Sequence, residues 1–298
     1  MKNSLLILHS ATVIMTPLLF AATGGLFTEL TGMLNIALEG LLLTGAFFSI
    51  AAIYYTGSIA AGIASAILAS LVLSALIGFT TLKLRSNVFI TGLAANLLAA
   101  GLTVVLSQRL FNTRGVVVLN DMRKIPSIHI PLIKNIPVIG ELISGHTLYV
   151  YASWLLLLAA WIVISKTPIG YRIRACGKDS EALASLGIKP ESYRFAVFLI
   201  SGIYCGIGGS FLSLNLGAFV PNVSAGKGWI ALVIIFLGGR KPQGLLAAAF
   251  IFGLAEAFSN YAQGLFNIPA DFILAMPYLF TLLAIVLASA YDKAGMRN

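Results

Sequence analysis

The sequence predicts an all-α protein that crosses a membrane many times. Of its 298 residues, 59% are hydrophobic and only 10% are charged, and the mean hydropathy is +0.96, far from the composition of ordinary soluble domains. Glu39 is the only charged residue between positions 32 and 82, and none occurs from 195 to 226. Such stretches can form helices of roughly 20 residues, enough to cross a ~30 Å hydrocarbon core. A transmembrane β-barrel fits less well, because the apolar runs are continuous rather than alternating.

The apolar segments predict about eight to ten spans in one transmembrane domain over residues 1–298, counting broken or re-entrant elements. The segments cover residues 9–27, 33–54, 58–82, 88–107, 148–165, 195–219, 229–237, 245–261 and 272–291. The first could imitate a signal peptide, but its apolar pattern continues past the possible cleavage site, so we expect a retained span. Segment 229–237 would reach only about 14 Å as a helix. We therefore expect it to be a broken or re-entrant element, which must be buried in protein or line a cavity.

The distribution of basic residues predicts the orientation. Lys83 and Arg85 lie in one short loop, and the connection of about 166–194 is rich in lysine and arginine. Two spans separate these loops, so both lie on one side, which the positive-inside rule assigns to the cytoplasm. The loop of about 108–147 would then be extracytoplasmic, although it also carries basic residues. The net charge of +9 is explained by basic loops beside anionic lipid, so we expect no nucleic-acid partner.

Cysteine and histidine are sparse and widely separated. The chain has Cys176 and Cys205, and three histidines at positions 9, 129 and 146, without any zinc-binding spacing. We expect no disulfide framework, no metal site and no cofactor.

The first candidate functional element is Gly-Met-Leu-Asn-Ile-Ala-Leu-Glu-Gly at 32–40. On a helix, Asn35 and Glu39 would share a face. A charge at the centre of a bilayer costs at least ~2.5 kcal/mol unless it meets a partner or water. Two interpretations stay open: Glu39 contacts substrate, or it caps or pins a neighbouring helix through a hydrogen bond.

The second element is the basic connection 167–188. Pro168 and Gly170 are expected to break the preceding span, Asp179 or Ser180 can cap a short helix, and Gly187 can end it. The pattern predicts a small amphipathic helix on the cytoplasmic face. It could be a solvated loop or a docking helix for a cytosolic partner.

The third element, 219–242, places Lys227 between two glycines. This resembles a phosphate loop only superficially, because the Walker spacing is missing. We therefore expect no ATPase activity in this chain, and any energy from ATP must come from another polypeptide.

Segments 30–46, 170–188 and 224–242, in this order, resemble the permease family of bacterial ABC importers for simple sugars, branched-chain amino acids and nucleosides. The resemblance spans nearly the whole chain and is closest to nucleoside permeases that work with basic membrane lipoprotein-type binding proteins. It implies a multi-pass subunit of the bacterial cytoplasmic membrane that moves a nucleoside or related sugar-containing solute by alternating access. The implied partners are a separate ABC ATPase, a second related permease or second copy, and an extracytoplasmic substrate-binding protein.

The resemblance also implies roles for particular residues. A helix that couples to the ATPase would include Gly170, Arg174, Ala175, Gly177, Ala182 and Gly187. Asn35, Glu39 and Trp229 would lie near the translocation path. For a nucleoside, the rings of Phe89, Phe219 and Trp229 could face the base, and Asn35, Asn96 and Asn222 could meet hydroxyl groups. Asparagines at helix ends also act as caps or interhelical bridges, so that interpretation stays open.

Other classes of protein remain possible. A secondary transporter driven by an ion gradient could use Glu39, Glu256 and Asp271 as membrane carboxylates. An ABC permease for sugars or branched-chain amino acids would look similar. A membrane-embedded enzyme is a weaker alternative, because the spans contain no histidine-rich cluster and no Gly-x-Ser-x-Gly elbow.

Overall fold

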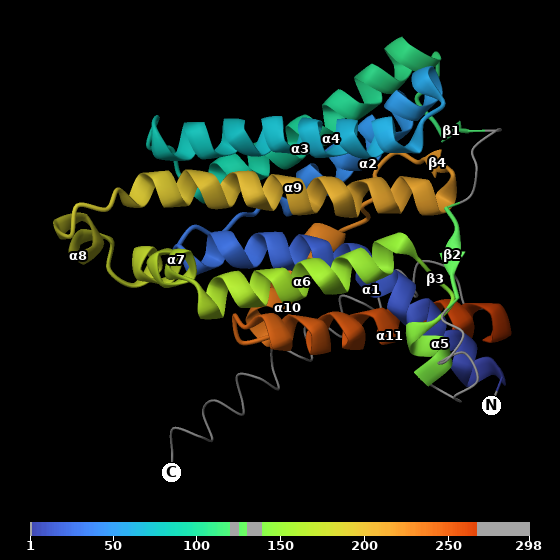
Figure 1. The fold of residues 1–298 in the computed structure, drawn as a ribbon. Coiled ribbons are helices and arrows are strands. Elements are labelled where there is room, and N and C mark those ends of the chain that lie inside the picture. The colour runs from blue at the N-terminus through green and yellow to red at the C-terminus, as the bar shows by residue number, and fades with distance from the viewer. Residues whose placement is uncertain (1, 120–124, 130–138, 267–298) are drawn as a thin grey trace.

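The structure, a computed structural model, describes residues 2–119, 125–129 and 139–266. Its long helices run side by side between two ends of the molecule (Figure 1). One end carries the short helices α7 (Pro168–Lys178) and α8 (Ser180–Ser185) and is called here the α7–α8 end. The opposite end carries four short strands and α5 (Ile139–Ile143) and is called the strand end.

Seven described helices are long and apolar enough to cross a membrane. They are α1 (Lys2–Leu30), α2 (Leu38–Thr56), α3 (Ile59–Leu82), α4 (Val88–Phe111), α6 (Leu148–Lys166), α9 (Pro190–Leu216) and α11 (Pro242–Phe266). Each matches an expected span, and the prediction of an all-α polytopic membrane protein is confirmed. The expected span 272–291 lies outside the described residues.

The expected half-span is the short helix α10 (Lys227–Leu237). Its 11 residues reach about 16 Å, roughly half of the hydrocarbon core. The helix begins after Gly226, whose φ of 82° is left-handed, and it ends just before Gly238. Glycine at both ends therefore confines the helix to half a span.

The connection between α1 and α2 is not helical, which corrects one expectation. Gly32, with a φ of 77°, follows the end of α1, and α2 begins only at Leu38. Asn35 therefore precedes the helix that carries Glu39, and the two do not share a helix face. The side-chain oxygen of Asn35 accepts a hydrogen bond from the backbone N–H of Ala37 at 3.1 Å, a local bond that competes with helix formation.

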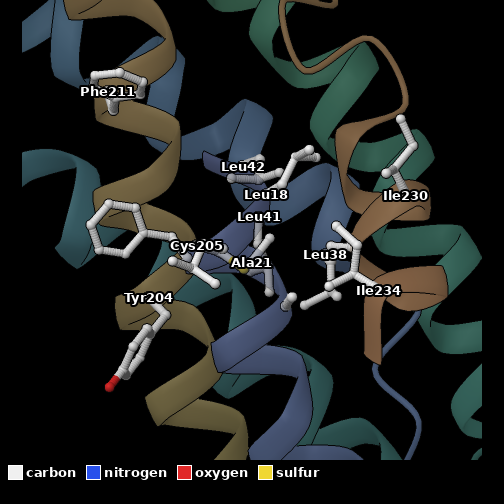
Figure 2. Packing of buried hydrophobic residues seen from close by; sticks show 14 of the residues in the cluster. Leu18, Ala21, Leu38, Leu41, Leu42, Tyr204, Cys205, Phe211, Ile230 and Ile234 are labelled. Atoms are coloured by element: carbon white, nitrogen blue, oxygen red, sulfur yellow. The ribbon is translucent and has the colours of Figure 1, made fainter. Parts of the chain in front are cut away.

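The core lies where α9 packs against α1, α2 and α3. Figure 2 shows side chains from α1, α2, α9 and α10 meeting in one cluster, among them Leu18, Leu41, Cys205 and Ile234. Small residues allow this approach: a Cβ on Gly209 of α9 would overlap the carbonyl of Leu42 in α2. Close packing of small residues is how helices associate inside a bilayer, where lipid tails are as apolar as leucine.

Two small antiparallel sheets close the strand end. In one, β1 (Val117–Val118) pairs with β4 (Ala218–Phe219), with Val117 opposite Phe219. In the other, β2 (Ser127–Ile128) pairs with β3 (His146–Thr147), with Ser127 opposite Thr147. The pairing of β1 with β4 ties the connection after α4 to the end of α9.

Replacing Gly209 with Ala should destabilise the protein, because the new Cβ would force α9 and α2 apart. We expect a loss of about 1–3 kcal/mol and a lower midpoint of thermal unfolding, measured on detergent-solubilised protein by fluorescence-detected size-exclusion chromatography. The matched control is Gly101→Ala in α4, where a Cβ meets no atom within 4 Å. It should be neutral or slightly stabilising, since alanine favours helices more than glycine. Equal midpoints for the two variants would contradict the packing described here.

Candidate functional site

The carboxylate of Glu39, in the first turn of α2, caps the start of α10. Its Oε1 accepts a hydrogen bond from the backbone N–H of Gly226 at 2.9 Å, and its Oε2 accepts one from Gly228 at 2.7 Å. The first N–H groups of a helix have no partner within the helix, and negative charge is favourable at a helix N-terminus. Glu39 thus lies at the N-termini of two helices at once. The contact of Glu39 with Gly226 and Gly228 is called here the Glu39 clamp.

The clamp requires glycine at position 228. A Cβ there would overlap backbone atoms of Glu39 and Leu38, so any side chain would push α10 away from α2. The two glycines beside Lys227 thus have structural roles: Gly228 allows a close approach of two backbones, and Gly226 adopts a left-handed φ of 82° before the helix.

Two asparagines hold the start of α2 beside the clamp. The Oδ1 of Asn96 accepts a hydrogen bond from the N–H of Gly40 at 2.7 Å, and its Nδ2 donates to the carbonyl of Ile36 at 3.0 Å. The Nδ2 of Asn35, which is buried, donates to the hydroxyl of Ser201 in α9 at 3.0 Å. Both amides therefore form caps or interhelical bridges, one of the two roles that the sequence left open.

The clamp lies at depth within the helix bundle. Asn96 is about a third of the way along α4, and Ser201 is near the middle of α9. Both are therefore at least about two helical turns from the ends of their helices. Polar groups at this depth are costly unless they are satisfied, and each of these groups has a hydrogen-bond partner.

A second charged contact joins α10 to α11. The Nζ of Lys227 lies 3.0 Å from Oε1 of Glu256, and the two side chains are 15% and 22% exposed. Sequence reasoning treated Lys227 and Glu256 separately and missed this pair, because the two residues belong to different helices. The available signal was their opposite charge: isolated charges in neighbouring apolar spans are expected to find each other.

The aromatic residues predicted for a solute path fall into two groups. Trp229 is 37% exposed and directly follows Gly228 of the clamp, and Phe89 is 55% exposed in the first turn of α4. Asn222 is also exposed, in the connection before α10. Phe219, by contrast, is fully buried and packs against Phe47 with ring centroids 5.1 Å apart, so the structure does not bring it to any accessible surface.

The connection 167–188 forms two short helices, where the sequence predicted one short capped helix. Asp179 caps α8, because its carboxylate accepts hydrogen bonds from the N–H groups of Glu181 and Ala182. Gly187, with a φ of 77°, follows the end of α8. Leu183 of α8 is buried, whereas Ala182 and Leu186 are exposed, Leu186 by 76%.

Four of the predicted coupling residues serve the packing of α7. A Cβ on Gly170 would overlap carbonyl oxygens at the end of α6, and one on Gly177 would overlap the carbonyl of Leu30. Arg174 donates to the carbonyl of Ile164 at 2.8 Å, and Ala175 is partly buried. Only Ala182 and Gly187, both on or next to α8, are exposed without such a packing role.

The two free cysteines are buried. Burial raises the pKa of the Cys176 thiol in α7, and the guanidinium of Arg194 opposes this shift. The thiol is therefore held in its neutral form, which is a poor nucleophile and metal ligand.

The structure brings together histidines that are far apart in the sequence. His9 of α1 and His146 of β3 stack at the strand end, with ring centroids 4.2 Å apart. His129 is also near: a Cβ added to Gly145 would lie 3.4 Å from the His129 ring and 3.8 Å from the His9 ring. Within the described ranges, no group of three or more His, Cys, Asp or Glu residues could hold a metal ion.

Replacing Glu39 tests the clamp. Glu39→Ala removes both acceptors, whereas Glu39→Gln keeps one and turns a donor toward the other N–H. Hydrogen bonds to a charged group contribute about 1.5–3 kcal/mol each, so we expect a larger loss of thermal stability for Glu39→Ala than for Glu39→Gln. The control is Glu191→Gln, an exposed carboxylate in the first turn of α9, which should unfold like wild type. A clamp without structural importance would leave both Glu39 variants as stable as this control.

Comparison with known proteins places this chain in a family. A family model described as "Branched-chain amino acid transport system / permease component" matches residues 6–289. The nucleoside ABC transporter permease protein NupC of Lactococcus lactis subsp. cremoris (strain MG1363) is 32% identical, and the alignment covers 97% of this chain and 93% of that protein. The guanosine ABC transporter permease protein NupQ of Bacillus subtilis (strain 168) is 31% identical over 94% of this chain and 91% of that protein.

Among solved structures, PsaBC from Streptococcus pneumoniae in complex with Fab aligns with a TM-score of 0.47 and 16% identity, over 93% of this chain and 89% of that chain. The family match and the relatives agree with the resemblance expected from the three sequence motifs. Because the family model covers nearly the whole chain and NupC is 32% identical over the same length, this chain belongs to the family of permease components of the branched-chain amino acid transport system.

Proposed function

We propose that this chain is the transmembrane permease subunit of an ATP-driven ABC importer for nucleosides or a related sugar-containing solute. The observation that carries this proposal is the similarity over nearly the full length to NupC and NupQ, which are named for nucleoside and guanosine transport. Sugars and branched-chain amino acids are the alternative solutes, and an ion-driven secondary transporter is the alternative mechanism.

A separate ABC ATPase subunit would supply the energy. The sequence contains no Walker A motif, so this chain has no means of its own to bind ATP by a phosphate loop. The permease would alternate between two packings of its helices that open to opposite sides, which requires a bistable interface rather than a catalytic residue. A second related permease, or a second copy of this chain, would complete the pathway.

The exposed side of α8 is the surface that we assign to the ATPase. This surface comprises Ala182 of α8 and the residues that follow the helix, Leu186 and Gly187, while buried Leu183 anchors α8 to the rest of the molecule. Basic residues support placing this end in the cytoplasm of a bacterial cell. Arg85, Arg194 and Glu191 line one pocket there, so the loop after α3 and the start of α9 lie on the same side. The substrate-binding protein would then contact the strand end.

The surface beside the Glu39 clamp is the region that we assign to the solute. Trp229 offers a partly exposed aromatic side chain, which suits the flat base of a nucleoside, and Asn222 is also exposed. The side chains of Asn35, Asn96 and Phe219 are hydrogen-bonded or packed within the protein. They would therefore hold the wall of the path in place rather than contact the solute.

Introducing a large charge on α8 should release the ATPase. We expect Ala182→Arg to abolish recovery of an ABC ATPase when the tagged chain is purified from its native membrane and bound proteins are identified by mass spectrometry. The matched control is Val116→Arg, which adds the same side chain at an exposed position near the strand end and should retain the ATPase. Recovery of the wild-type chain without any ATPase in mild detergent would contradict the importer assignment.

The energy source and the solute can be tested together by uptake. Cells that overproduce the complete system should accumulate a labelled nucleoside, and unlabelled nucleosides should compete at least about tenfold better than glucose or leucine. ATP depletion should stop uptake, whereas a protonophore applied at constant ATP should not. Uptake that survives ATP depletion but collapses with the proton gradient would instead identify a secondary transporter.

A further inference from the structure

The short helix α10 is fixed to other helices at both of its ends. At its start, Glu39 of α2 accepts two hydrogen bonds from it, and Lys227 pairs with Glu256 of α11. Just after its end, Nε of Arg240 lies 2.9 Å from Oε1 of Glu29 in the last turn of α1. Between these ends, Ile230, Ala231, Ile234 and Ile235 are almost completely buried. The helix is therefore packed and anchored as one rigid piece.

The pair formed by Arg240 and Glu29 joins two residues that are unfavourable in their own local settings. Arg240 has a φ of 56°, a left-handed conformation that disfavours side chains other than glycine. Glu29 places negative charge at the C-terminal end of α1, where the helix dipole repels it, and its side chain is only 11% exposed. Residues that break local preferences are expected where a function requires them.

The end of α1 that binds Arg240 also contacts α7. Gly177 of α7 packs so closely that its Cβ would overlap the carbonyl of Leu30, the residue after Glu29. Arg194 of α9 strengthens this junction, because it donates hydrogen bonds to the carbonyls of Thr31 and Cys176. A displacement of α7 must therefore shift the end of α1, and with it the partner of Arg240.

We propose that α10 is a strut that carries movement of α7 and α8 to the Glu39 clamp, and that the ion pair between Arg240 and Glu29 is its anchor at the α7–α8 end. The alternative route along the chain, residues 31–37, is not helical and is held to α9 and α4 by Asn35 and Asn96, whereas α10 is one continuous packed helix between its two anchored ends. In this arrangement Arg240 and Glu29 are positioning residues: they touch neither solute nor ATP, but they couple hydrolysis to the opening of the path. This inference rests on the proposed function of an ATP-driven importer.

The test uses the complete importer, with both permease subunits and the ATPase, reconstituted in liposomes with its binding protein. We expect Arg240→Glu and Arg240→Gln to reduce nucleoside transport at least about tenfold, while the ATPase stays bound and ATP hydrolysis stays within about twofold of wild type. The Arg240 side chain is 58% exposed, so its replacement is expected to leave the fold intact, which monodisperse elution would verify. The charge-swapped double variant Glu29→Lys/Arg240→Glu should recover most of the lost transport.

The matched control is Lys241→Glu, the same charge reversal at the exposed neighbouring position, which should transport like wild type. If Arg240→Glu transports nucleoside and hydrolyses ATP like wild type, or if Lys241→Glu loses as much transport as Arg240→Glu, the proposal of a strut is wrong. It is also wrong if the charge-swapped variant recovers no transport. The assignment as an importer would be unaffected. A wild-type chain that binds no ATPase would overturn the proposed function itself, and the strut with it.

Discussion

The arrangement of this permease depends on one carboxylate placed between two helix N-termini. Glu39 belongs to the first turn of α2 and accepts hydrogen bonds from the first N–H groups of α10. A helix that starts inside a membrane exposes N–H groups that lipid cannot satisfy, and a carboxylate inside a membrane carries a charge that lipid cannot solvate. Each of these costs is offset by the other group. The same contact allows α2 and α10 to begin inside the helix bundle. Without it, helices at this depth would have to continue without interruption.

The polar residues around the clamp extend the same principle. Asn96 satisfies the start of α2, Asn35 ties the non-helical connection to α9, and Lys227 pairs with Glu256. At each of these positions, a hydrophobic residue could not form the hydrogen bond or ion pair that the interrupted helices and the buried charges require. They form a rigid support, and Trp229 is held on the exposed side of that support by its neighbour Gly228. An ordered framework of this kind suits a pathway that must change shape by moving whole helices.

The α7–α8 end divides its residues between packing and exposure. Gly170 and Gly177 allow α7 to lie directly on the ends of α6 and α1, so substitutions there would disturb the permease itself. Ala182 of α8 and Leu186, which follows it, are exposed. The two roles lie next to each other along about twenty residues of chain, so the surface proposed for the ATPase is directly joined to the contacts of α7 with α6 and α1.

The sequence by itself determined the class of protein, the positions of the seven described spans, the short length of α10 and a short helix capped by Asp179 or Ser180. These features follow from local chemistry: continuous apolar runs, glycine at the ends of a segment, and an aspartate before a short helix. Only the tertiary structure decided what Glu39, Asn35 and Asn96 bind, because their partners lie on other helices. The sequence placed Asn35 and Glu39 on one helix face, but the hydrogen bond from Ala37 to the Asn35 side chain and the left-handed Gly32 end regular structure before that helix begins. The pairing of Arg240 with Glu29 and the stacking of His9 on His146 were equally out of reach, since contacts between distant segments depend on how the helices pack and leave no local pattern in the chain.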